Sequence, residues 1–263
     1  MQETKGTGAA SKLKGFAVDD SWRRFGITKH LGGVYATQRL VKMCNITAGQ
    51  YVLDIGCGTG YTACLLAKKH QARVVASDIN PDLLEEAKKR ISREGVSDSV
   101  TVEEADAHDL PFPDDTFDQV IAESVLVFCD KVRAASEIRR VLKPSGVFGD
   151  TEATYTRPPP AEFAELMAEA SRTSGGIMLE EEWRAVYRKA GFQDTSSAVY
   201  PLNSKEEFIS AVRVNGLRFF ASIAKALFDP TVRGALLSRD SAQGLRDAYS
   251  YMGYGLYVSR KAP

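Results

Sequence analysis

Three alternating glycines, Gly56, Gly58 and Gly60, follow a short apolar segment of the chain. Glycine lets a backbone turn tightly and approach a ligand without a Cβ atom in the way. Residues 51–55 before the turn are predicted to form a buried strand, and residues 62–69 after it a helix. A turn between strand and helix presents free backbone N–H groups at the positive end of the helix, which suits an anionic or polar nucleotide-like ligand. The first hypothesis is therefore a cofactor site.

The spacing of the glycines separates two kinds of cofactor. The dinucleotide pattern G-x-G-x-x-G needs its third glycine at position 61, where this chain has Tyr61. The pattern is instead G-x-G-x-G, and Asp54 precedes it. This arrangement resembles motif I of the class I S-adenosylmethionine (SAM) methyltransferases, in which the loop lies against the methionine part of SAM. The resemblance implies a binding role for Asp54, Gly56, Gly58, Thr59 and Gly60.

An acidic residue, Asp78, follows the second predicted strand, 73–77, and lies 20 residues after Gly58. A carboxylate in this position can accept hydrogen bonds from both hydroxyls of a ribose. The feature supports any adenosine cofactor, NAD included, so by itself it does not choose between SAM and a dinucleotide. Asp78 and its neighbour Ile79 complete the cofactor-binding residues predicted around the ribose.

A longer run after the third predicted strand strengthens the resemblance to the methyltransferases. It consists of Glu-Ala-Asp-Ala at 104–107 and Leu-Pro-Phe-Pro-Asp-Asp-Thr-Phe-Asp at 110–118. The resemblance implies that Asp106 lies near the exocyclic amine of the adenine and that the small Ala107 leaves room for the ring. The next residue, His108, is interpreted as a polar turn residue rather than as a base.

Strands and helices alternate from residue 51 onward, which is typical of a parallel sheet with right-handed crossovers. The predicted fold is α/β: a Rossmann-like, seven-stranded, mostly parallel sheet with helices on both faces, an N-terminal helical cap and a helical insertion before the last strand. Further elements are expected at 34–44, 80–91, 100–102, 118–123, 133–142, 147–153, 161–172, 180–190, 195–200 and 254–260.

We expect the chain to divide into a mobile arm and N-terminal cap (1–30), a SAM-binding core (31–202), a helical insertion (203–250) and the final strand of the core (251–263). Two interpretations of the insertion stay open: packing on the core or on a second copy, and a lid over a lipid-like or aromatic acceptor. If the insertion is a lid, deleting it should abolish methylation and spare cofactor binding. Its apolar helical face comprises Leu217, Phe219, Phe220, Ile223, Ala224, Leu227 and Phe228.

In the family that the chain resembles, the methyl group and its acceptor meet at the end of the fourth strand, where this chain has Glu123. Glu123 is a candidate to bind the cofactor, to orient the acceptor or merely to cap the strand. Glu152, His30 and Tyr35 are the other candidates for a base, and the sequence does not rank them. Thr28 is a further pocket candidate. The resemblance implies direct in-line transfer to the acceptor, with S-adenosylhomocysteine as product.

The balance of charge disfavours a nucleic-acid partner, because Lys plus Arg and Asp plus Glu number 34 each. Four scattered cysteines, the lack of an apolar signal core and the lack of a run near the ~20 residues of a membrane helix indicate a cytoplasmic protein. The overall expectation is a SAM-dependent methyltransferase acting on a small molecule, without bound metal, as a monomer or homodimer. A non-catalytic SAM-binding or interaction protein and an NAD-dependent oxidoreductase remain alternatives.

Overall fold

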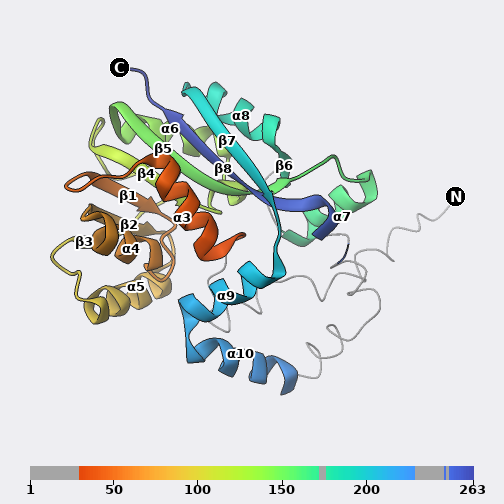
Figure 1. Ribbon diagram of the computed structural model, residues 1–263. Coiled ribbons are helices and arrows are strands. Elements are labelled where there is room, and N and C mark those ends of the chain that lie inside the picture. The colour runs from red at the N-terminus through yellow and green to blue at the C-terminus, as the bar shows by residue number, and fades with distance from the viewer. Residues whose placement is uncertain (1–29, 172–175, 229–245, 247–248) are drawn as a thin grey trace, which may run out of the picture.

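The computed structural model describes residues 30–171, 176–228, 246 and 249–263. The predicted arm, Thr28 and part of the insertion lie outside this range. The chain folds as one mixed sheet with helices on both faces (Figure 1). Its helices are α3 (Gly33–Cys44), α4 (Tyr61–His70), α5 (Pro81–Glu94), α6 (Lys131–Val141), α7 (Ala161–Ser171), α8 (Glu180–Lys189), α9 (Ser204–Asn215), α10 (Leu217–Phe228) and the 3-10 turn η1 (Leu126–Phe128).

Seven strands form a continuous sheet in the order β3-β2-β1-β4-β5-β8-β7, and the two-residue β6 (Met178–Leu179) pairs with β5 outside this path. The pairs from β3 to β5 are parallel, and β8 runs antiparallel to both of its neighbours. The predicted Rossmann-like sheet is thus confirmed. Its strands are β1 (Tyr51–Ile55), β2 (Arg73–Asp78), β3 (Val100–Glu104), β4 (Phe117–Glu123), β5 (Leu142–Tyr155), β7 (Gln193–Pro201) and β8 (Met252–Arg260).

Alternate residues of β1 belong to two separate hydrophobic cores, because successive side chains of a strand point to opposite faces of the sheet. Val52 packs with Leu40, Leu66 and Ile91 of the helices α3, α4 and α5. Leu53 belongs to the other core, which the helices α6 and α8 cover. A strand buried on both faces holds its carboxyl end firmly, and that is where the glycine turn begins.

Local capping explains where two of these helices begin. Asn80 accepts a hydrogen bond of 2.9 Å from the backbone N–H of Asp82 and is followed by Pro81, so α5 begins where the sequence predicts. The helix α6 begins earlier than the predicted residue 133, because Asp130 caps it by accepting from Arg133 N at 3.1 Å.

The strand β5 also begins earlier than predicted, at Leu142 instead of Val147. Leu142 pairs with Phe117, and the register then shifts before Gln119 pairs with Val147. The Lys-Pro-Ser-Gly run at 143–146, which lies between the predicted helix 133–142 and the predicted strand 147–153, is therefore an irregular part of the strand.

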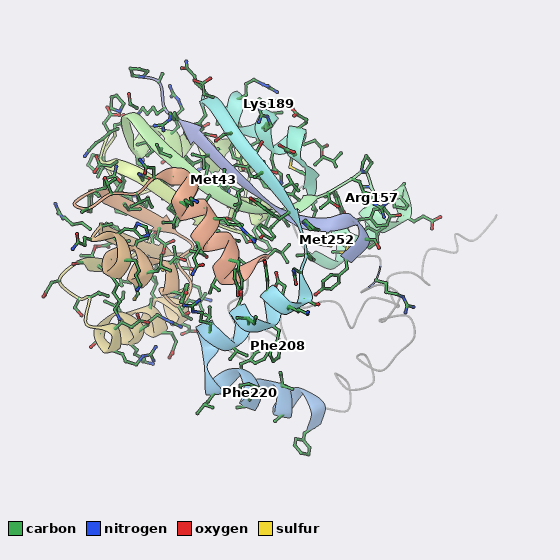
Figure 2. All side chains as sticks on the ribbon, viewed as in Figure 1. Met43, Arg157, Lys189, Phe208, Phe220 and Met252 are labelled. Carbon is green, nitrogen blue, oxygen red and sulfur yellow. The ribbon has the colours of Figure 1, made fainter. Side chains whose placement is uncertain are left out.

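The described part of the insertion forms α9 and α10 (Figure 2), with α9 against α3 and α10 farther from the sheet. Large apolar side chains of both helices remain exposed, among them Phe208, Ile209, Leu217, Phe220 and Phe228. Phe208 nevertheless contacts Phe219, with ring centroids 5.6 Å apart. Among the residues that the structure describes, no helix is long and apolar enough to cross a membrane.

Candidate active site

The three glycines all adopt the left-handed conformation, with φ of 64° at Gly56, 52° at Gly58 and 74° at Gly60. A Cβ atom on Gly56 would lie 2.4 Å from a methyl carbon of Val125, so a side chain there would collide with the segment after β4. Gly60 is the N-cap of α4 and has no side chain to offer its first turn. The loop therefore brings bare backbone to the carboxyl end of β1, as the sequence predicts.

Asp54 lies beneath this loop with 2% of its surface exposed. Burial, followed by the nearby negative charge of Glu123, raises the pKa of its carboxyl group well above the usual range, and the N–H of Ala63 acts in the opposite direction. Its Oδ2 atom has no hydrogen-bond partner among the described residues. A buried carboxylate oxygen in this state is suited to receive a donor from a ligand.

Glu123, at the end of β4, is held by two threonine hydroxyls. Thr62 of α4 donates to Oε1 at 2.6 Å, and Thr37 of α3 donates to Oε2 at 2.7 Å. His30 joins the group, with its Nε2 atom 3.6 Å from Glu123 Oε2 and 3.2 Å from Thr37 Oγ1. The structure thus brings together two predicted site residues, Glu123 and His30.

Thr37 and Thr62 both bind a predicted site residue, although the sequence alone does not indicate either of them. Each lies inside a helix, where a threonine most often has no role beyond packing, so no local pattern marks it. The nearest signal is that Thr62 comes two residues after the last glycine of the turn.

The carboxylates of the buried Asp54 and of Glu123, whose side chain is 7% exposed, fit the methionine end of SAM. Neither has a lysine or arginine as ion-pair partner within the described ranges, and His30 is the one basic side chain recorded beside Glu123. Buried negative charge is costly unless a cation compensates it. SAM carries an ammonium and a sulfonium group, so its charges complement this pair.

Asp78 lies at the carboxyl end of β2, next to the glycine turn. Its Oδ2 accepts from Gly58 N and its Oδ1 from Asn80 N, each at 2.9 Å. The carboxylate therefore holds the turn in place, a role that the sequence does not reveal. Ile79 follows with 65% of its surface exposed, so an apolar side chain is available beside the predicted ribose position.

Asp106 and Ala107 follow β3, and His108 orients the first of them. Asp106 Oδ1 accepts from His108 N at 2.9 Å and lies 2.7 Å from His108 Nδ1. Both contacts lower the pKa of the Asp106 carboxyl group below its usual range, and the hydrogen bond from the backbone N–H of His108 has the larger effect. His108 Nε2 accepts from Asp130 N at 3.0 Å, which supports its interpretation as a turn residue.

Glu152 occupies a different environment from the one expected of a base. It is fully buried, and its Oε1 accepts three backbone N–H groups, from Val125 at 3.0 Å, Leu126 at 2.7 Å and Val127 at 3.3 Å. Burial and the adjacent Asp150 raise the pKa of this carboxyl group. Glu152 therefore holds the segment after Glu123 through Oε1, while its buried Oε2 has no hydrogen-bond partner among the described residues.

The remaining candidate base, Tyr35, is half-buried on α3, and its hydroxyl has no hydrogen-bond partner among the described residues. The structure does not bring it into the group around Glu123.

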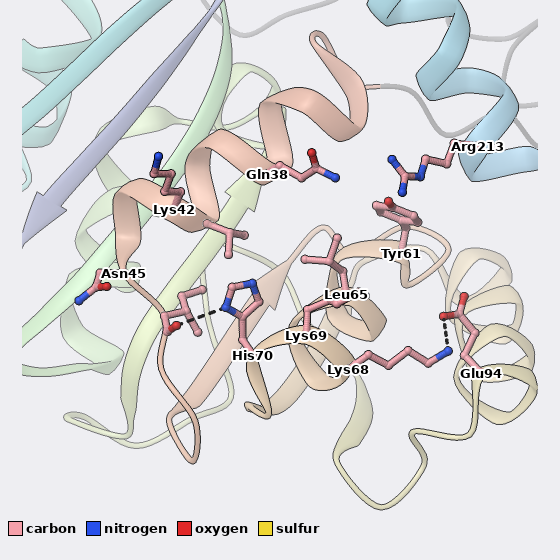
Figure 3. Close-up of a pocket in the computed structure, with 12 residues that line it drawn as sticks. Gln38, Lys42, Asn45, Tyr61, Leu65, Lys68, Lys69, His70, Glu94 and Arg213 are labelled. Atoms are coloured by element: carbon pink, nitrogen blue, oxygen red, sulfur yellow. Dashed lines mark hydrogen bonds and ion pairs between the residues drawn. The ribbon is translucent and has the colours of Figure 1, made fainter.

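Tyr61, the residue in place of a third dinucleotide glycine, lines a separate hollow of about 530 Å³ (Figure 3). The hollow lies between α3, α4 and Arg213 of α9, and His30 and Glu123 are not among its lining residues. Arg90 of α5 lies over the Tyr61 ring at 5.8 Å from its centroid. Tyr61 thus faces this hollow and packs beneath Arg90.

Comparison with known proteins agrees with this geometry. Residues 53–149, from β1 into β5, match the family described as "Methyltransferase domain". Over 175 residues the chain is 37% identical to the uncharacterized methyltransferase YodH of Bacillus subtilis (strain 168), covering 66% of this chain and 73% of that protein. It is 33% identical over 235 residues to the 27-O-demethylrifamycin SV methyltransferase of Amycolatopsis mediterranei (strain S699), covering 86% of this chain and 82% of the relative.

Among solved structures, the fold is similar to that of a SAM-dependent methyltransferase from Thiobacillus denitrificans in complex with S-adenosyl-L-homocysteine. The TM-score is 0.67 at 18% identity, and the match covers 98% of this chain and 99% of that one. At this identity the likeness shows the fold alone, while the closer relatives show the family. The glycine turn, the paired carboxylates and these relatives lead to one conclusion: the chain belongs to the class I SAM-dependent methyltransferases.

Proposed function

We propose that this enzyme methylates a hydroxyl group of a small, largely apolar or aromatic molecule. The 27-O-demethylrifamycin SV methyltransferase supports a small-molecule acceptor by its name. The exposed apolar side chains of the insertion, such as Phe208 and Phe220, support an apolar one. The observation that carries the proposal is the hydrogen-bonded group of His30, Thr37 and Glu123 at the end of β4.

Bound SAM supplies an electrophilic methyl group, and we assign its contacts to three regions of the site. Asp54, Glu123 and the turn that includes Thr59 hold the methionine end. Asp78 binds the ribose. Ile79 lies beside the ribose, and Asp106 and Ala107 border the adenine. These assignments rest on position at the carboxyl ends of β1 to β4, where ligands of open α/β folds bind.

His30 is the proposed base, because the hydrogen-bond directions leave one of its nitrogens free. Thr37 gives its hydroxyl proton to Glu123 at 2.7 Å, so its oxygen accepts from Nε2–H of His30 at 3.2 Å. In this tautomer Nδ1 is unprotonated, and the described residues offer it no partner. Nδ1 then takes the proton of the acceptor hydroxyl while Thr37 and Glu123 orient the ring.

Two of the other predicted bases are left out of this proposal on geometry. Glu152 is committed to three backbone N–H groups. Tyr35 is not among the described residues that bind Glu123, which are Thr37, Thr62 and His30.

The cytoplasmic setting remains a proposal. It is supported by four cysteines that are all buried and unbridged: Cys44, Cys57, Cys64 and Cys129. The equal numbers of basic and acidic residues support the absence of a nucleic-acid partner. A monomer or homodimer is also proposed, to be checked by sedimentation.

The test combines binding with turnover. Calorimetry should give SAM and S-adenosylhomocysteine binding to the wild type and weaker binding to Asp78→Ala, with the exposed Asp82→Ala as matched control. A metabolite screen by mass spectrometry should then find a product heavier by one CH₂ group, with the methyl on oxygen. SAM binding without any methylated product would favour the non-catalytic alternative, and unchanged affinity in Asp78→Ala would remove the ribose assignment.

A further inference from the structure

The helix α3 begins without a cap of its own. Its N-cap residue is Gly32, which has φ of 79° and no side chain to accept a hydrogen bond. The first N–H groups of any helix lack partners within the helix, and leaving them buried and unpaired is unfavourable. The partners of α3 must therefore come from another part of the chain.

The first helix of the insertion supplies them. Glu207 of α9 accepts from Gly32 N through Oε1 at 2.6 Å, and Ser210 accepts from Val34 N through Oγ at 3.1 Å, both in buried surroundings. A Cβ atom on Gly33 would lie 2.3 Å from the Cβ of Ser210, so α9 comes this close because residue 33 is glycine. The carboxylate of Glu207 also lies at the positive end of the α3 dipole.

The helix that α9 caps is the one that carries Thr37. Thr37 lies one turn after Gly33 and donates to Glu123 Oε2 at 2.7 Å. His30, whose backbone carbonyl accepts from Gly33 N at 3.2 Å, precedes the same helix end. A shift of the N-terminal end of α3 would therefore move both residues relative to Glu123.

We infer that Glu207 and Ser210 are positioning residues for the methyl-donor site, which act through α3 to set Thr37 and His30 against Glu123. The inference rests on the proposed role of Glu123 at the methionine end of SAM. It also replaces the expectation that removing residues 203–250 spares cofactor binding: α9 supports the donor site, and its loss weakens SAM binding.

The test measures SAM affinity by calorimetry in the full-length protein. Ser210→Ala and Glu207→Ala should each weaken binding about three- to tenfold, the effect of one hydrogen bond. Glu207→Gln keeps an accepting oxygen and should restore most of the affinity. Glu206→Ala is the matched control on the same helix: Glu206 also binds α3, but through the partly exposed side chain of Arg39, and its loss should change affinity less than twofold.

A double-mutant cycle separates positioning from general stability. If α9 acts through Thr37, Ser210→Ala should have little further effect on SAM affinity in a Thr37→Val background. Thermal unfolding gives the folded fraction of each variant, and the SAM affinities are corrected for it. If Glu207→Ala does not fold, the Ser210→Ala variant alone tests the inference. Unchanged affinity in both single variants, or additive losses in the cycle, would overturn the inference. A wild type that bound no SAM would instead contradict the proposed function.

Discussion

Thr37 and Glu123 are 86 residues apart in the chain, and the hydroxyl of the first donates a 2.7 Å hydrogen bond to the carboxylate of the second. The bond joins the helix before β1 to the carboxyl end of β4. Because Thr62 of α4 binds the other oxygen at 2.6 Å, the carboxylate is fixed between two helices. A charged group held in this way is pre-organised for a cationic ligand.

Replacing Glu123 by glutamine should therefore weaken SAM binding about ten- to a hundredfold, the range for hydrogen bonds to charged groups. The variant keeps the size of the side chain and removes its charge. Glu103→Gln, on the exposed face of β3, is the control and should bind SAM as the wild type does. Equal affinities in the two variants, measured by calorimetry, would show that Glu123 does not meet the cofactor.

His30→Ala should lower kcat by about 10²- to 10⁴-fold, the contribution of a general base. The variant should still bind SAM to saturation, because Asp54 and Glu123, the carboxylates proposed to face the positive charges of SAM, are unchanged. His70→Gln serves as control, since His70 lies in the outer hollow and binds the carbonyl of Ile46. A kcat for His30→Ala close to that of the wild type would contradict the proposed base.

Gly56→Ala should destabilise the fold and abolish SAM binding. The new methyl group would meet Val125 at 2.4 Å and would also require a left-handed backbone at a non-glycine residue. Gly95→Ala provides a close control, because Gly95 has φ of 67° and a Cβ atom added there would meet nothing within 4 Å. Only the backbone cost of about 1–2 kcal/mol then applies. Urea unfolding compares the two, and equal losses would contradict the predicted collision.

The pH dependence of stability should be sensitive to Asp150. It is fully buried, it accepts a hydrogen bond from Tyr187 at 2.8 Å, and burial raises its pKa to about 8. The pKa of an aspartate in the unfolded chain is about 4. Between that pH and pH 8, Asp150 binds more protons in the folded state than in the unfolded state. The stability that Asp150 contributes is therefore present at low pH and is lost as the pH rises toward 8.

Asp150→Asn removes this titration and keeps an oxygen for Tyr187. Its free energy of unfolding, relative to the wild type, should therefore increase from pH 5 to pH 8, with a slope of at most about 1.4 kcal/mol per pH unit. Asp98→Asn, at an exposed position, should follow the wild type throughout. A difference between Asp150→Asn and the wild type that does not change with pH would contradict the buried-proton explanation.

The local sequence predicted the backbone elements around the site well. The glycine turn, the Asn80 cap and the alternation of strands are determined within a few residues, and the positive φ values at Gly56, Gly58 and Gly60 agree with them. The start of β5 could not be predicted in the same way. A Lys-Pro-Ser-Gly run is typical of a loop, and only the pairing of Leu142 with Phe117 draws it into the sheet.

The details of the site depend on contacts across long stretches of sequence. The roles of Thr37 and Thr62 follow from the place where α3 and α4 meet β4. The sequence offers Glu152 as a candidate base, because the backbone N–H groups that bind it belong to the distant segment after β4 and leave no local signal. In the same way, Glu207 and Ser210 belong to a segment that the sequence presents as a separable insertion. Hydrogen bonds between distant segments leave no periodic pattern that a local interpretation could use.

The position of β8 also constrains how the chain can fold as it is made. This strand, 252–260, separates β5 from β7 and pairs with both, and β7 has no other recorded strand partner in the described structure. During synthesis β7 therefore emerges with both edges open and stays so until about 50 further residues have been translated, while the parallel half of the sheet can already pair. The enzyme can complete its sheet only after Arg260 has left the ribosome, so a nascent chain stalled within the insertion would expose β7 to chaperones or to other chains.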